Sequence, residues 1–255
     1  MVTAQLNDPR VADLVRSGLI RVALFLPQYT KDPVTGELRA GPVFSEIARA
    51  LANRLGVELR LTGYQNPRQV IECLKANDCD VAFMVPDTSR IDELGFSQPI
   101  LESDFTCLVL ARSAIYRMGD VDRLGIRIAA VRNHVSTLIL TRILKQAELV
   151  TAETPDATFA MLRSGHATAM ASARSVLLEY STKLPESRVL EDRYGAQLLA
   201  MAVPKRQSAW LAFIGEFVEE AKTSGLVQRA IESAGRAGLQ VAPLTNPTAE
   251  LKSEQ

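Results

Sequence analysis

The sequence is poor in the residues that build metal sites and disulfide frameworks. It contains three cysteines, Cys73, Cys79 and Cys107, and two histidines, His134 and His166. A low, odd number of cysteines does not form a disulfide framework, so we expect three reduced thiols. Cys73 and Cys79 flank a turn and could approach each other, but buried free thiols are the preferred interpretation. Because no Cys/His cluster has ligand spacing, we expect no zinc site and no cofactor.

The sequence also lacks an excess of either charge and any long apolar run. Its 255 residues include 29 basic and 29 acidic side chains, so the formal net charge is zero. A nucleic-acid-binding protein normally carries a basic excess, which argues against a nucleic-acid partner. No apolar run approaches the roughly 20 residues that cross a bilayer, so we expect no insertion into a membrane.

The first residues, MVTAQLNDPRVADLVRSG, contain no basic segment followed by an apolar stretch. This pattern predicts no signal peptide. It leaves two locations open: the cytoplasm, or an exported protein whose leader has been removed.

Hydrophobic residues make up 47% of the chain and charged residues 23%, an ordinary globular composition. Short β-rich runs alternate with amphipathic runs at helical spacing, and glycine or proline marks many of the boundaries. We expect strands over 20–26, 57–61, 80–85, 105–111, 126–131, 149–152, 167–171, from 188 and over 198–203. We expect helices over 43–55, 67–76, 136–146, 155–164, 175–181, 209–224 and 226–234.

The order of these elements predicts an α/β fold with two lobes. Alternating strands and helices favour parallel pairing, with helices on the faces of each sheet. The second α/β unit is inserted into the first, and the strands 105–111 and 198–203 bracket it as two crossovers. We therefore expect lobe 1 to comprise 1–110 and 196–255, lobe 2 to comprise 111–195, and 241–255 to be a loose tail.

Four groups of motifs resemble the family-3 solute-binding proteins of ABC importers, which have the type 2 periplasmic-binding-protein fold. They occur in the order of that family and extend over residues 17–235 or so. They are SGLIRVA at 17–23 with TGEL at 35–38 and the helix 47–57; DVA at 80–82 with TSR at 88–90 and FSQPI at 96–100; DRLGIRI at 122–128; and the helical end 217–227.

The resemblance implies a receptor whose two lobes close over a small solute. Strands of an open α/β sheet place ligands beyond their carboxyl ends, which agrees with a cleft between the expected lobes. The family resemblance also implies an ABC permease as a partner and a periplasmic location. We expect a monomer.

Arg90, with Thr88 beside it, is the first candidate for ligand binding. It corresponds to the arginine of the family's T-x-x-R region, which holds the ligand carboxylate through the planar fork of its guanidinium. The alternative is a solvated arginine beside Asp92 and Glu93. The family's small residue before this segment is replaced by Met84-Val85-Pro86, which argues against recognition of an ordinary α-amino acid.

The second candidate is the segment that opens the helix expected after the strand 126–131. It contains Arg132, Asn133, His134, Ser136 and Thr137, where the family has a "G-T" turn. A helix N-terminus presents free backbone N–H groups, which suit an anion, and His134 could donate to an acid. The alternative is plain N-capping by Asn133 or Ser136.

The third candidate is Arg174, which follows Ala171-Ser172-Ala173, a segment where the family places the aspartate that holds a ligand ammonium. An arginine facing the cleft would repel an ammonium; the alternative is a surface arginine paired with Glu179. In the first loop, Gln28 and Tyr29 follow the first strand, and Tyr29 could stack or form a hydrogen bond.

We therefore expect a non-catalytic protein that binds a small anionic solute, a carboxylate, for an ABC transporter. A cytoplasmic metabolite sensor of the same fold is the first alternative, because no signal peptide is predicted. A dehydratase-like enzyme is the second, since the fold has catalytic relatives and His134 is a candidate base. No paired carboxylates or Ser/His/Asp arrangement supports an enzyme.

Overall fold

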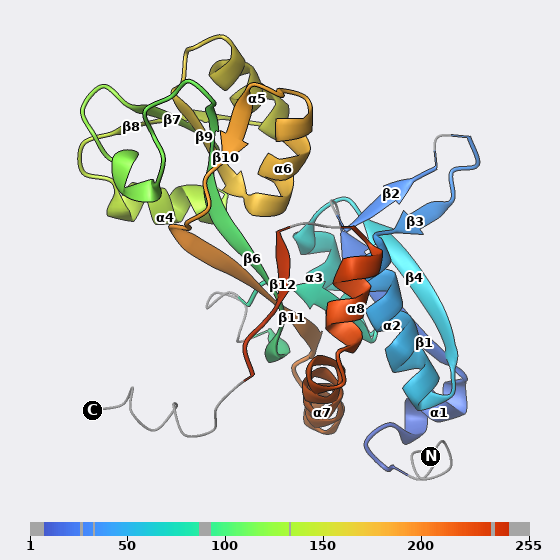
Figure 1. The fold of residues 1–255 in the computed structure, drawn as a ribbon. Helices are drawn as coiled ribbons and strands as arrows, with labels where there is room; N and C mark the ends of the chain where they lie inside the picture. Colours follow the sequence, from blue (N-terminus) through green and yellow to red (C-terminus); the bar gives the residue numbers. More distant parts are fainter. Residues whose placement is uncertain are drawn as a thin grey trace, which may run out of the picture. The chain divides into compact units, whose positions relative to one another are not determined.

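The computed structural model describes residues 8–25, 28–32, 34–86, 93–132, 134–235 and 238–244. The chain forms two compact units (Figure 1). Unit 1 comprises Met1–Leu101, Leu198–Gly235 and Val241–Gln255, and unit 2 comprises Glu102–Gln197 and Arg236–Gln240. The mixed α/β architecture with helices on its sheets confirms the fold class expected from the sequence.

The sheet of unit 1 is built on β1 (Leu19–Phe25). This strand pairs in parallel with β4 (Glu58–Tyr64) on one side and β5 (Val81–Met84) on the other. β11 (Gly195–Pro204) runs antiparallel to β5. A separate hairpin joins β2 (Tyr29–Lys31) and β3 (Leu38–Ala40). Parallel pairing brings the carboxyl ends of β1, β4 and β5 to one edge of the sheet.

Amphipathic helices cover the sheet of unit 1. α2 (Pro42–Leu55) buries Ile47, Ala48 and Leu51 and contacts α8 (Leu226–Ser233) (Figure 1). The remaining helices are α1 (Ala12–Ser17), α3 (Pro67–Lys75) and α7 (Ser208–Thr223). Position 63 in β4 requires glycine, because a Cβ at this position would lie 2.6 Å from the ring of Tyr29 in β2.

The sheet of unit 2 surrounds the second half of β6 (Leu94–Leu110). β6 pairs antiparallel with β9 (Ala169–Ala173) and β10 (Ser187–Val189). β7 (Arg127–Val131) pairs in parallel with β9 and with β8 (Glu148–Ala152). The helical segments of this unit are η1 (Met118–Asp120), α4 (Val135–Ile143), α5 (Pro155–Arg163) and α6 (Arg174–Thr182).

Among the boundaries that differ from the expected ones, two have a clear physical reason. The expected helix over 136–146 ends at Ile143, because the carboxylate of Asp122 accepts bonds from the backbone N–H groups of Lys145, Gln146 and Ala147. β6 begins at Leu94 and not at 105, although the segment before 105 carries buried polar side chains. Two of them, Glu102 and Asp104, are neutralised by Arg193.

The expectation of three reduced thiols was wrong, because Cys73 and Cys79 form a disulfide. Asn77 adopts a left-handed conformation (φ 59°), and the N–H of Asp78 donates to the carbonyl of Cys73 at 3.0 Å. This turn brings the two Cα atoms to 5.5 Å, within the range that a disulfide spans. Cys107 is a free, buried thiol.

Residues 239–242 are packed against the fold, at the start of the segment from 241 that the sequence predicted to be a loose tail; residues 245–255 lie outside the described residues. β12 (Leu239–Val241) pairs with β6, and the N–H of Ala242 donates to the carbonyl of Ile100 at 3.2 Å. The buried ammonium of Lys222 donates to the carbonyl of Pro243 at 3.0 Å. We call residues 238–243 the C-terminal strap; it carries the chain out of unit 2 and back into unit 1.

No helix of the described part of the chain has both the length and the apolar character needed to cross a membrane.

Candidate functional site

The carboxyl ends of three parallel strands define one edge of unit 2. β7 ends at Val131, β8 at Ala152 and β9 at Ala173. The residues that follow these strands include Arg132, His134, Glu153 and Arg174. This edge is where an open α/β sheet holds a ligand, so three predicted site residues of unit 2, Arg132, His134 and Arg174, lie near each other in the topology.

His134 is the N-cap residue of α4. Its Nδ1 accepts a bond from the backbone N–H of Ser136 at 3.3 Å and lies 2.7 Å from the hydroxyl of Ser136. Burial lowers the pKa of the His134 imidazole below its usual value. The ring is therefore neutral at pH 7. The N-cap bond of the helix is made by the side chain of His134 and not by that of Ser136.

The other residues of this segment have different roles. Thr137 is buried, and its hydroxyl donates to the carbonyl of Val131 at 2.6 Å, which ties α4 to the end of β7. Arg132 is exposed, and its Nε donates to Glu153 at 2.7 Å. Asn133 lies outside the described residues.

Arg174 is engaged inside unit 2. Its guanidinium donates to the carbonyls of Leu190 and Glu191, both at 2.7 Å, and its Nε lies 3.5 Å from Asp104. The partner is therefore Asp104 and not Glu179, which Lys183 contacts. These contacts fix the chain that leads into β11, and we leave Arg174 out of the proposed binding residues.

In unit 1, Gln28 and Tyr29 serve the local fold. The amide of Gln28 donates to the carbonyl of Phe83 at 2.9 Å and accepts from the N–H of Phe25 at 3.2 Å. Tyr29 is 2% exposed, and its hydroxyl accepts from Gln65 at 3.4 Å. Both side chains are buried beyond the carboxyl end of β1. The predicted ligand residues Thr88 and Arg90 lie outside the described residues.

Sequence reasoning missed Tyr194, which lies beneath the cap of α4. Its ring stacks on Phe105 at 6.0 Å between ring centroids, and Phe105 meets His134 edge-on at 5.9 Å. The hydroxyl of Tyr194 is buried and has no hydrogen-bond partner among the described residues. Nothing in the local sequence marks Tyr194, because 60 residues separate it from His134.

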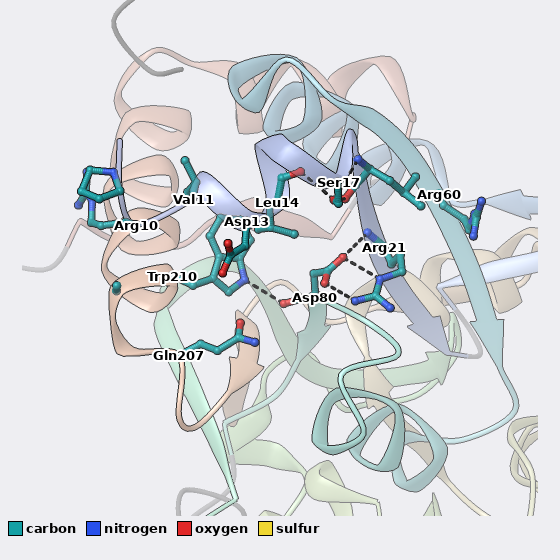
Figure 2. A pocket seen from close by; sticks show the side chains of 13 residues that line it. Arg10, Val11, Asp13, Leu14, Ser17, Arg21, Arg60, Asp80, Gln207 and Trp210 are labelled. Atoms are coloured by element: carbon teal, nitrogen blue, oxygen red, sulfur yellow. Dashed lines mark hydrogen bonds and ion pairs between the residues drawn. The ribbon is translucent and has the colours of Figure 1, made fainter. Parts of the chain in front are cut away.

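A hollow of about 740 Å³ lies at the opposite end of β1, where the strand begins (Figure 2). Asp80 accepts there from the backbone N–H and the guanidinium of Arg21, at 2.7 Å each. The indole of Trp210 donates to the carbonyl of Asp80 at 2.9 Å. These groups satisfy one another, so we assign them to the fold of unit 1.

No group of three or more potential metal-binding side chains occurs among the residues that the structure describes.

Known proteins resemble this chain in fold and in sequence pattern. The family described as bacterial extracellular solute-binding proteins, family 3, matches residues 43–234. An ancestral cationic amino acid solute-binding protein superimposes with a TM-score of 0.72 and 22% identity, over 88% of this chain and 98% of that one. The L-cysteine receptor of Neisseria gonorrhoeae gives a TM-score of 0.64 and 19% identity, over 88% and 92%.

Two further relatives add a transporter component and a sensor. An amino acid ABC transporter substrate-binding protein of Streptococcus pneumoniae, bound to L-arginine, gives a TM-score of 0.65 and 21% identity, over 87% of this chain and 97% of that one. The virulence sensor protein BvgS of Bordetella pertussis is 26% identical over 132 residues, which are 51% of this chain. The match covers 10% of the sensor, so this chain spans only a small part of that relative.

The structural neighbours are less than 25% identical to this chain and show its fold. The family match covers most of the sequence, in agreement with the motifs between residues 17 and 235. The chain belongs to the bacterial extracellular solute-binding proteins of family 3.

Proposed function

We propose that this chain is a non-catalytic receptor for a small carboxylate that lacks an α-amino group. The supporting observation is the chemistry of the carboxyl edge of unit 2. The acid that directly follows a strand at this edge, Glu153, is paired with Arg132. An α-ammonium needs a carboxylate or another acceptor, and this edge instead offers donors: the guanidinium N–H groups of Arg132 that do not bond Glu153, and the imidazole N–H of His134.

The engagement of the other acids supports the same conclusion. In the described part of unit 2, the buried or half-buried carboxylates already have partners: Glu102 and Asp104 with Arg193, Asp120 with Arg123, and Asp122 with backbone N–H groups. The segment Ala171-Ser172-Ala173 at the end of β9 contains no carboxylate. An ammonium-bearing ligand would leave its charge unpaired here, which is costly in a desolvated site.

Arg90 is the proposed clamp for the carboxylate, because Thr88-Ser89-Arg90 resembles the family's T-x-x-R region. Truncating one partner of a desolvated charge pair costs about 2–5 kcal/mol. Arg90→Ala should therefore weaken binding by roughly 30-fold or more. Arg112→Ala, an exposed arginine of unit 2, serves as the matched control and should bind normally.

Titration calorimetry on matched pairs tests the proposal. Each pair consists of a 2-oxo or 2-hydroxy acid and the amino acid with the same side chain. We expect tighter binding of the oxo or hydroxy acid. Tighter binding of the amino acid, or an Arg90→Ala variant with unchanged affinity, would reject the proposal. Mass spectrometry after long incubation should recover the acid unchanged, whereas loss of water from it would indicate a dehydratase.

The similarity to a virulence sensor supports a second candidate, a receptor module that signals and does not deliver its solute to a permease. The two candidates differ in the size and location of the native product. An antibody against this chain, used on fractionated cells of the source, should detect a free protein of this size if the chain serves an importer. A much larger product in the membrane fraction would support the sensor.

A further inference from the structure

The surroundings of His134 determine which of its ring nitrogens carries the proton. A backbone N–H is always a donor, and the N–H of Ser136 points at Nδ1 from 3.3 Å. Nδ1 must therefore be the unprotonated, accepting nitrogen. The hydroxyl of Ser136, 2.7 Å away, then donates to Nδ1 as well. In the neutral ring the proton belongs to Nε2.

The groups packed against His134 keep the ring neutral. Phe105 presents an apolar ring to it at 5.9 Å, and burial lowers its pKa. Tyr194 and Cys107, the titratable groups on the same side, stay neutral because burial raises the pKa of each. The charge of Arg132 is already paired with Glu153. No described carboxylate contacts the ring to stabilise an imidazolium.

The Nε2–H of His134 is free to bind a solute. No described group accepts a bond from it, and Nε2 is not among the fully buried atoms that lack a partner. It therefore keeps contact with solvent at the carboxyl edge of unit 2. The ring can donate through Nε2 but cannot accept, because Ser136 occupies its accepting nitrogen.

Tyr194 supports the ring of His134 through Phe105. The ring of Tyr194 stacks on Phe105 at 6.0 Å between ring centroids, and Phe105 meets His134 edge-on at 5.9 Å. The hydroxyl of Tyr194 has no hydrogen-bond partner among the described residues. Ser136 therefore fixes the ring through Nδ1, and the aromatic pair supports its face.

We propose that Ser136 and Tyr194 position His134 as a fixed Nε2–H donor for the oxo or hydroxyl oxygen at C2 of the bound solute. The inference rests on the proposed function and adds a residue that decides specificity. An oxo or hydroxyl oxygen at C2 can accept from Nε2–H, whereas the ammonium that replaces it in the amino acid presents only donors to a donor. His134 thus discriminates between an acid and its amino counterpart, and Ser136 and Tyr194 act through it.

The tautomer can be measured without any ligand. The chain has two histidines, so His166→Asn leaves His134 as the single imidazole. Nitrogen-15 NMR of this variant, at a pH above the imidazole titration, should show a protonated Nε2 and an unprotonated Nδ1. Ser136→Ala should increase the Nδ1–H population, and Ser136→Thr, which keeps the hydroxyl, should restore the original tautomer.

Binding of the tightest acid from the matched pairs gives the second readout. His134→Asn keeps a residue suited to the N-cap and should weaken binding about tenfold, the worth of one hydrogen bond. Ser136→Ala should weaken it about threefold. Tyr194→Leu, which removes the ring stacked on Phe105, should weaken it by a smaller factor. Each variant should bind the corresponding amino acid with little change, so that discrimination falls.

The outcomes separate this inference from the proposed function. A proton on Nδ1, or a charged ring above the usual imidazole pKa, overturns the positioning by Ser136. Unchanged acid affinity in His134→Asn overturns the specificity role. If the unaltered protein binds none of the acids, the proposed function fails, and the NMR measurement still decides how His134 is positioned.

Discussion

At the scale of single residues, Arg188 organises the loop after β6. Its guanidinium donates to the carbonyls of Leu110, Ala111, Ser113 and Ile115 and lies 4.5 Å from the ring of Tyr116. Arg188→Met should lower the free energy of unfolding by about 2–4 kcal/mol, because four carbonyls, three of them in partly buried bonds, lose their donor. Urea denaturation measures the loss. Arg112→Met, exposed in the same loop, should cost little; equal losses in both variants would contradict this role.

His134 also makes stability depend on pH. Its pKa is lowered in the folded protein, whereas in the unfolded chain it is near the ordinary value of about 6.5. As the pH falls, His134 takes up a proton in the unfolded chain before it does so in the folded protein. The contribution of His134 to the free energy of unfolding is therefore fully present above about pH 6.5 and is lost as the pH falls below that value. Denaturation at about pH 7 and pH 5 should show a smaller decrease for His134→Asn than for the unaltered protein. An equal decrease would mean that His134 does not titrate as inferred.

At the scale of elements, the disulfide joins the end of α3 to the residues before β5. The loop is short, with a sequence separation of 6, so the chain-entropy contribution is about 2 kcal/mol. Cys73→Ser should lower the free energy of unfolding by this amount, and Cys107→Ser should leave the bond intact. A thiol assay on denatured protein, prepared without reductant, should find one thiol before reduction and three after it. Three thiols before reduction would rule the bond out.

The C-terminal strap depends on a glycine where it meets α6. Gly238 has a φ of +92°, and a Cβ would lie 2.7 Å from the backbone nitrogen of Ser175. Gly165 has a similar positive φ of +73° but open space around it. Replacing either glycine by alanine costs about 1 kcal/mol, because an L-residue is strained at a positive φ. Only Gly238→Ala adds a clash, with the backbone of Ser175. Thermal unfolding should therefore show a larger loss for Gly238→Ala; equal losses would contradict the contact.

The regular elements were predictable because their apolar spacing is local, as in α2 and β7. The start of β6 was not, since Gly95, Pro99 and the acids at 102 and 104 are typical of a loop and Arg193 neutralises those acids from a distant part of the chain. The same limit applies to the site. The segment at 132–137 pointed to a helix N-terminus, but the tautomer of His134 depends on geometry that no spacing reveals.

At the scale of the whole molecule, the chain passes between its two units along β6 and β11 and again through the C-terminal strap. The strap is bonded on both sides: the carbonyl of Gly238 accepts from Ser103 of unit 2 at 3.4 Å, and the carbonyl of Pro243 accepts from Lys222 of unit 1 at 3.0 Å. Two parts that share fewer connections unfold less cooperatively.

Ending the chain at Gly235 should therefore broaden or split the calorimetric unfolding transition. It should also lower the midpoint, because the ammonium of Lys222 loses an acceptor in a buried position. Ending the chain at Leu244 is the matched control, since it keeps the whole strap, and its transition should match that of the full chain. A single, unshifted transition in the shorter variant would show that β6 and β11 alone carry the coupling between the units.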